Sequence, residues 1–295
     1  MKEIVYFLVF IISLIFANPL IAFSTVDKFG VYSWVDSLSS SGLALNEDEF
    51  DELRSNPFCV VARSGSPARR YLKTLDAVRR KKEELIFKYH SASSSEEENE
   101  VIAESISYIN AMVYRVLFPL WVGIDWDFNG VPGKVPGVRR PIACGHIVEK
   151  ILQDSGFEIG RSRGYRLAYL APWDFVRSVK GGEPDHFRDW VGLEGYFTKK
   201  GSGLYILGIW GGYVGHILFG YYDSSGKLWL LHSGIHPRGA SVSIDDGEYY
   251  LRDFMYWDDL WITKVDAGLA RKWLEGEQII PLISSDRRGD AYGGK

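Results

Sequence analysis

The fold is decided by residues 214–234, which read VGHILFGYYDSSGKLWLLHSG. Apolar and aromatic residues fill both halves of this stretch, and Asp223-Ser224-Ser225-Gly226 between them has the composition of a turn. The stretch therefore predicts two antiparallel strands joined as a β-hairpin, Val214 to Tyr222 and Leu228 to His232. Two further runs have the composition of strands, Leu204 to Leu207 and Trp261 to Val265.

A histidine interrupts the apolar run in each strand of this hairpin, at positions 216 and 232. A buried imidazole needs a hydrogen-bonding partner, and His216 and His232 can supply one for each other. Pairing that is symmetric about Ser224 places the two residues directly opposite, whereas pairing about Ser225 makes them diagonal neighbours. A turn centred between the two serines puts the rings on opposite faces of the sheet, so the sequence leaves the register open.

A cysteine lies upstream of both histidines and opens a predicted helix. Cys144 precedes an apolar stripe with helical spacing, and the helix is expected to end near Gly156. Free N–H groups and the helix dipole at such an N-terminus favour a thiolate, so we expect a lowered pKa for the Cys144 thiol. Gly145 is expected to leave the approach to the sulfur uncrowded. The apolar stripe consists of Ile147, Val148, Ile151 and Leu152.

These residue types in this order predict a nucleophile, a base and a residue that orients the base. We assign Cys144 as the nucleophile, His216 as the base and His232 as the orienting residue. A cysteine that merely packs in a core is the competing interpretation. His236 and Ser233 are lesser candidates for the orienting residue. If the two histidines face opposite sides of the sheet, the next candidates are Asp127 and Asn129.

The same motifs resemble the papain-like NlpC-type cell-wall peptidases and their amidase relatives. Those proteins carry a cysteine on a helix, a histidine on a strand and a polar residue on the next strand. Gly123 to Gly130, which reads GIDWDFNG, is similar to the aromatic segment that precedes the nucleophile in that family and lines its pocket. The resemblance covers roughly Pro119 to Val265, and uncharacterised exported bacterial proteins with a preceding helical hairpin are closer still.

The resemblance implies an α+β, papain-like core in which the cysteine-bearing helix packs on an antiparallel sheet. It also implies hydrolysis of an amide or peptide bond in peptidoglycan stem peptides. Ala143 stands where many relatives carry Asp. Trp126 stands where Tyr is frequent, so the sequence leaves open whether a side-chain hydroxyl supplies a second hydrogen bond to the oxyanion of the reaction intermediate. The expected substrate-binding residues are Trp126, Asp127, Asn129, Gly145, Trp210 and Tyr213.

Two other functions remain open from the sequence. The Cys-Gly-His-Ile-Val string that begins at Cys144 also resembles lipid acyltransferases, but in those the base precedes the cysteine, and here His216 follows it. Acyl transfer to an amine by the same three residues, in place of hydrolysis, is the first alternative. The second alternative is a peptide-binding module that keeps the fold without turnover.

The first residues of the chain predict export. Lys2 is followed by an almost unbroken apolar run from Ile4 to Ala17, and small residues at positions 22 and 24 suit a signal-peptidase cut before Thr25. We expect residues 1–24 to be a cleaved signal peptide and the mature protein to be periplasmic or secreted, without stable membrane insertion. An uncleaved membrane anchor is the alternative.

A helical extension is expected between this segment and the predicted catalytic part. Residues 25–65 give no clear pattern. Ser66 can cap a long amphipathic helix that reaches Tyr89, and Ser95 with Glu98 predicts a capping box for a second helix that ends at Pro119. The expected organisation is thus a helical extension over residues 25–118, a catalytic domain over 119–283 and a flexible polar tail over 284–295.

Composition excludes several classes of function. A net charge of -4 gives no electrostatic footprint for nucleic acid. The two cysteines, Cys59 and Cys144, are too few for a disulfide scaffold, and we expect Cys59 to be a small buried apolar residue. No zinc-binding or nucleotide-binding spacing occurs, so neither a metal nor a cofactor is predicted.

Overall fold

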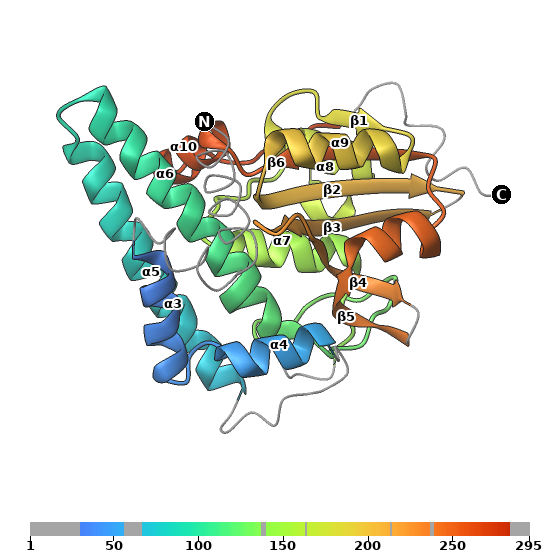
Figure 1. The fold of residues 1–295 in the computed structure, drawn as a ribbon, viewed down its shortest axis with the longest axis horizontal. Coiled ribbons are helices and arrows are strands. Elements are labelled where there is room, and N and C mark those ends of the chain that lie inside the picture. Colours follow the sequence, from blue (N-terminus) through green and yellow to red (C-terminus); the bar gives the residue numbers. More distant parts are fainter. Residues whose placement is uncertain are drawn as a thin grey trace, which may run out of the picture.

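The chain forms an α+β fold around one antiparallel sheet, as a computed structural model shows (Figure 1). The structure describes residues 30–55, 67–136, 140–162, 164–212, 214–236 and 239–283. Outside these ranges lie the predicted signal peptide at residues 1–24, the predicted tail at 284–295, Cys59 and Tyr213.

Six strands form the sheet in the order β1-β6-β2-β3-β4-β5, and each neighbouring pair is antiparallel. The predicted hairpin is confirmed, and its second strand runs four residues further than expected. The sequence analysis missed β1 and β5. The strands are β1 Asp185–Phe187, β2 Gly203–Gly211, β3 Val214–Tyr222, β4 Leu228–His236, β5 Gly239–Asp246 and β6 Asp259–Lys264.

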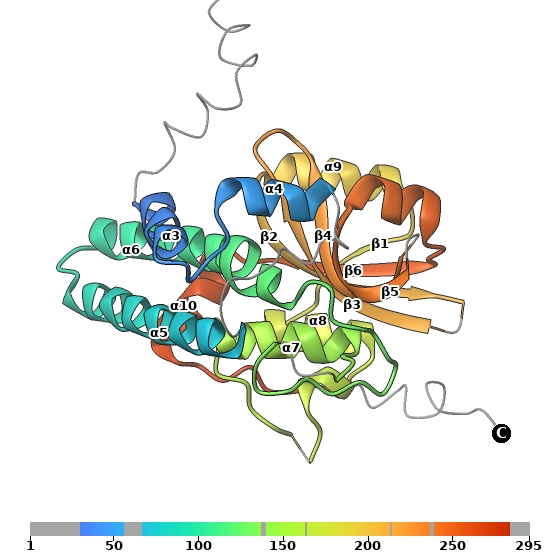
Figure 2. The ribbon, with the colours of Figure 1, turned by 90° about the horizontal axis from the view of Figure 1, so that it is seen from below.

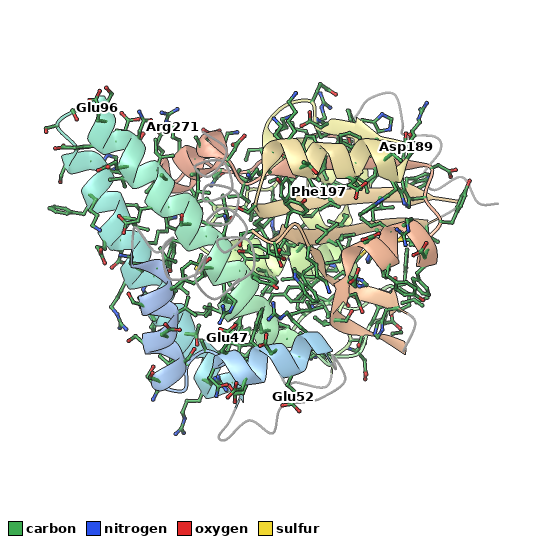
Figure 3. All side chains as sticks on the ribbon, viewed as in Figure 1. Glu47, Glu52, Glu96, Asp189, Phe197 and Arg271 are labelled. Atoms are coloured by element: carbon green, nitrogen blue, oxygen red, sulfur yellow. The ribbon has the colours of Figure 1, made fainter. Side chains whose placement is uncertain are left out.

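Helices cover both faces of this sheet. Figure 2 shows α7, Cys144–Asp154, and α8, Pro172–Lys180, on one side and α9, Trp190–Lys200, on the other. We call these the α7 side and the α9 side. On the α9 side, Phe197 packs edge-on against Tyr205 of β2 with 4.9 Å between ring centroids (Figure 3). The apolar stripe of α7 joins the core on the opposite side, so each face of the sheet has its own core.

The predicted helical hairpin is present as α5, Pro67–Ser91, and α6, Ser95–Ala111. The predicted capping pair is wrong by one residue. Ser94 has the extended backbone of an N-cap, and its side chain accepts from the Glu97 N–H, while the Glu97 carboxylate accepts from Ser93. The helical chain also continues past Pro119, as a π-helix at Met112–Leu117 and a 3₁₀ turn at Phe118–Trp121.

The hairpin is not separated from the rest of the fold by a break in the core. Buried side chains of both its helices belong to the same apolar cluster as α7 and the α7 side of the sheet. The stretch Ser95–Trp121 is long and apolar enough to cross a membrane, with mean hydropathy 1.2, but 72% of that window is buried inside the fold. It is therefore a core helix of this structure.

Other helices complete the described chain and were not predicted. Two short ones lie in the region for which no element was predicted, residues 25–65, and another packs against α6 (Figure 1). They are α3 Val31–Ser40, α4 Glu47–Ser55, η3 Leu167–Tyr169, η4 Tyr249–Phe254 and α10 Ala267–Glu275.

Candidate functional site

The register of β3 and β4 brings the two predicted histidines together. Phe219 pairs with Leu231, which centres the hairpin on Ser225 and makes His216 and His232 diagonal neighbours on one face. The His216 Nε2 lies 3.1 Å from the His232 Nδ1, and the rings are edge-to-face. His216 is 6% exposed and His232 is fully buried. The expected meeting of the two rings is confirmed.

Glycine at position 234 makes this contact possible. Gly234 follows His232 by two residues on the same face, and a Cβ there would lie 2.9 Å from the His216 Cε1 and 3.2 Å from the His232 Nδ1. These distances are shorter than a relaxed carbon contact, so any side chain would push the rings apart. The glycine therefore leaves the space in which the two imidazoles touch.

Cys144 meets the sheet where β3 and β4 separate. Their ladder runs only from the turn to Phe219 and Leu231, although both strands continue. Beyond that point the backbone N–H of Ile217 donates to the Cys144 sulfur in place of a β4 carbonyl, and the N–H groups of Cys144 and Gly145 also point at it. The sulfur thus lies against the residue that follows His216.

The predicted nucleophile and the predicted base come from opposite sides of the sheet. Ile217 belongs to the core on the α7 side and Leu218 to the core on the α9 side, so strand alternation places His216 on the α9 side. Cys144 begins α7 and reaches the open seam between the strands. No hydrogen bond joins the sulfur to the His216 ring among the described residues. That the Cys144 sulfur lies within about 4 Å of one nitrogen of His216 stays a prediction.

The expected lowering of the Cys144 pKa is wrong for this structure. Cys144 is a free thiol with part of its surface exposed, yet burial raises its pKa more than the surrounding N–H groups lower it. Burial, and next the neighbouring His232, hold the pKa of His216 well below its usual value. Both groups are therefore neutral near pH 7, Cys144 as a thiol and His216 as an uncharged imidazole.

The sequence analysis missed a carboxylate that extends this arrangement. Asp245 on β5 accepts from the His232 Nε2 at 2.9 Å and from the Ser243 hydroxyl at 2.6 Å. Burial opposes its ionisation, but the His232 ring and the Ser243 hydroxyl hold the Asp245 pKa below its usual value. The alternation of Ser241, Val242, Ser243, Ile244 and Asp245 is the period of a strand and was the signal available in the sequence.

The Tyr250 ring closes the α9 side of this cluster. Its centroid lies 4.7 Å from that of His232, and its hydroxyl donates to the Ile235 carbonyl. Burial raises the pKa of Tyr250, with further contributions from nearby Asp245 and Cys144. The Cys144 sulfur is thus close enough to act on a group that packs against His232.

Backbone hydrogen bonds fix the entry to α7 beside the histidines. The Ser233 hydroxyl donates to the Ile142 carbonyl at 2.6 Å, which ties β4 to the residue two before Cys144. The Ile142 and Ala143 N–H groups donate to the carbonyls of Asp125 and Gly130. The segment that resembles the pocket wall therefore runs directly against the chain that leads to the nucleophile.

Three predicted substrate-binding residues lie in this segment. Trp126 is half-buried and its N–H donates to the Ala240 carbonyl at the end of β5. Asp127 and Asn129 are exposed in a turn, where the Asp127 carboxylate accepts from the Asn129 N–H at 2.8 Å. Since the two histidines share a face, neither Asp127 nor Asn129 is needed to orient the base.

The expected reason for Gly145 is wrong. A Cβ at Gly145 would lie 2.5 Å from the Ala168 carbonyl oxygen, so the glycine admits the η3 turn and leaves no open space above itself. Glu149, on the next turn of α7, is 1% exposed and holds η3 by accepting from the Ala168 N–H and from Arg166. This glutamate was not predicted, because nothing in the sequence shows which face of α7 meets η3.

The two other histidines near the site, His146 and His236, are buried against neighbouring side chains. His146 is 5% exposed and lies edge-on to Tyr169, with 4.9 Å between ring centroids. His236 is buried and its Nε2 lies 3.1 Å from the Ser241 hydroxyl. His232 is the imidazole whose nitrogen meets the predicted base, at 3.1 Å from the His216 Nε2.

Trp210 pairs with Gly215, the residue before His216, and two surface pockets are lined by other residues. Trp210 is partly buried at the end of β2 and packs on the α7-side core. Pockets of about 350 and 390 Å³ lie near α9 and η4, and Cys144, His216 and His232 line neither of them. Within the described ranges, no group of three or more His, Cys, Asp or Glu side chains is placed to hold a metal ion.

Comparisons with family models, with curated proteins and with solved structures found no match to the chain. The geometry of the site therefore carries the functional argument.

Proposed function

We propose that this protein is an exported, papain-like cysteine hydrolase that cleaves an amide or peptide bond. The observation that carries the proposal is the buried contact between the His216 Nε2 and the His232 Nδ1, made beside the strand residue that binds the Cys144 sulfur. A buried pair of imidazoles next to a free, partly exposed thiol matches the roles of base, orienting residue and nucleophile.

The reaction begins from the neutral pair. As the Cys144 sulfur attacks the substrate carbonyl, the His216 Nδ1 takes the thiol proton, and the imidazolium returns it to the leaving nitrogen as the C–N bond breaks. Water then attacks the thioester, His216 accepts one of its protons, and cleavage of the C–S bond releases the acid and restores the thiol. The raised pKa of Cys144 and the lowered pKa of His216 mean that proton transfer accompanies attack.

The N-terminus of α7 supplies the stabilisation of the developing oxyanion. The N–H groups of Cys144 and Gly145 surround the sulfur and belong to the first turn of the helix, whose N–H groups have no partner within the helix. An oxyanion formed on the attacked carbonyl lies within reach of the same groups. No side-chain hydroxyl is required as a second donor.

Stem peptides of peptidoglycan are the substrate class that we favour. The resemblance of residues 119–265 to NlpC-type peptidases supports it, together with the apolar run at the start of the chain. The half-buried Trp126 and the exposed turn that follows it border the entry to α7, where they can contact an extended peptide.

The test is mass spectrometry of purified cell-wall fragments incubated with wild-type protein and variants. We expect cleavage products from wild type and their loss, by at least about a thousandfold in rate, in Cys144→Ala and His216→Ala, because nucleophile and base act as a unit. His232→Gln is expected to retain part of the rate, since the amide oxygen can still accept from the His216 N–H.

Three outcomes separate the functions. Products that carry water support hydrolysis, whereas products in which the acyl group has moved to an added amine indicate acyl transfer. Fragments that bind wild type and Cys144→Ala equally, without any cleavage, contradict the proposal and indicate a binding module.

A further inference from the structure

The strongest additional feature of the structure is the chain of polar groups that starts behind His232. Asp245 and Ser243 lie on β5, on the face that meets His232, and they are 7% and 0% exposed. From there the contacts run from the Asp245 Oδ2 to His232 and from His232 to His216. Each group in this chain is buried, so its hydrogen bonds are stronger than they would be in water.

The direction of each hydrogen bond follows from the carboxylate. An ionised carboxylate can only accept, and the low pKa of Asp245 keeps it ionised at neutral pH. The Ser243 hydroxyl and the His232 Nε2 must therefore both donate to it. At pH 8, where an ordinary imidazole is neutral, a His232 ring that carries its proton on Nε2 has a lone pair on Nδ1, and this lone pair accepts from the His216 Nε2–H.

We propose that Asp245 is a positioning residue that fixes the tautomers of both histidines, so that the lone pair of His216 lies on Nδ1 and is available to Cys144. The assignment rests on the proposed function, because it gives a role to a lone pair that only a base needs. Without the carboxylate, His232 would carry its proton on Nδ1 and donate to the His216 Nε2. His216 would then carry its own proton on Nδ1, the nitrogen that has to accept the proton of the Cys144 thiol.

The experiment is ¹⁵N NMR of the histidine side chains in the full chain at pH 8, where ordinary imidazoles are neutral. The nitrogen shifts distinguish a protonated ring nitrogen from one with a lone pair, and His232→Gln assigns the signals. In wild type we expect His216 and His232 both protonated on Nε2. A wild-type His216 protonated on Nδ1 overturns the proposal, and this measurement needs no substrate.

The variant is Asp245→Asn, whose amide nitrogen can donate to the His232 Nε2. We expect both rings to switch to the Nδ1-protonated form and kcat/KM to fall by about 10² to 10⁴, as a base in the wrong tautomer requires. Unchanged tautomers in a folded Asp245→Asn protein contradict the role of Asp245, even if the protein cleaves its substrate normally.

Asp246→Asn is the matched control. Asp246 is the next residue on β5 and faces the other way, where it pairs with Lys227 near the surface. The same change of carboxylate to amide there should leave the tautomers and kcat/KM as in wild type. If no variant and no substrate give cleavage but the tautomers behave as expected, the proposed function fails while the assignment of Asp245 stands.

Discussion

At the scale of single residues, one missing side chain decides whether the histidine pair forms. His216 and Gly234 are cross-strand neighbours by register, but β3 and β4 have separated there. The His216 ring fills the space above Gly234 and reaches His232. Gly234, which has no side chain, therefore controls how the imidazole rings of His216 and His232 are placed.

Gly234→Ala tests this control. The added methyl group would lie within 2.9 Å of the His216 ring, so we expect the rings to move apart and kcat/KM to fall about 10- to 100-fold. Overpacking should also lower the free energy of unfolding by about 1–3 kcal/mol. Steady-state kinetics and urea denaturation measure the two effects.

The control for that variant is Gly195→Ala in α9. A Cβ at Gly195 has no atom within 4 Å, and alanine favours a helix, so this protein should be as active as wild type and slightly more stable. Wild-type kinetics in Gly234→Ala would show that the close contact is not required.

At the scale of elements, α7 is held at its N-terminal end by two separate clamps. Ser233 binds the chain just before the helix, and the Glu149 carboxylate binds the η3 turn that lies on Gly145. Both clamps act within about one and a half turns of Cys144. The position of the nucleophile thus depends on groups outside its own helix.

Glu149→Gln tests the second clamp. The change removes the carboxylate that pairs with Arg166. It also places an amide NH₂ group, which is a donor, against Arg166 and the Ala168 N–H, which are donors themselves. Removing one partner of a buried ion pair lowers stability by about 3–5 kcal/mol, and we expect about 2–3 kcal/mol here because 34% of the Arg166 side chain is exposed. Urea denaturation measures it.

The exposed Glu83 on α5 supplies the comparison, since Glu83→Gln removes the same charge at the surface and should change stability by less than about 0.5 kcal/mol. Equal stability of the two variants would mean that η3 is held by its apolar contacts alone.

At the scale of the whole molecule, folding removes the His216 imidazole from water and couples stability to pH. Burial, and next His232, lower the pKa of His216 in the native state below the value of 6.5 that an exposed histidine has. The unfolded chain therefore binds a proton first as the pH falls. The contribution of His216 to the free energy of unfolding is therefore fully present above pH 6.5 and is lost as the pH decreases toward the native pKa.

We expect the free energy of unfolding to decrease between pH 6.5 and 5, with a contribution from His216 of up to about 1.4 kcal/mol per pH unit. His216→Gln should remove this contribution, so its curve should be flatter than that of wild type. His90→Gln, at an exposed position on α5, should keep the wild-type slope. Parallel curves for wild type and His216→Gln would contradict the burial of a neutral imidazole.

The sequence determined the elements in which local pattern is strong. Alternation and turn composition predicted β3, β4 and their turn, and helical spacing predicted α5, α6 and α7 with nearly correct limits. The strand β1 and the helices around residues 31–55 were missed because they are short and their stability comes from packing against distant elements. The α+β class, with an antiparallel sheet, could be predicted; the strand order could not.

The candidate site divides in the same way. The sequence by itself determined the candidate residues, Cys144, His216 and His232, because a polar ring in an apolar strand and a thiol at a helix start are visible locally. Only the tertiary structure decided the register that joins the rings, the addition of Asp245 and the raised pKa of the thiol. Register, burial and partner choice depend on contacts between segments far apart in the chain, and no local pattern encodes them.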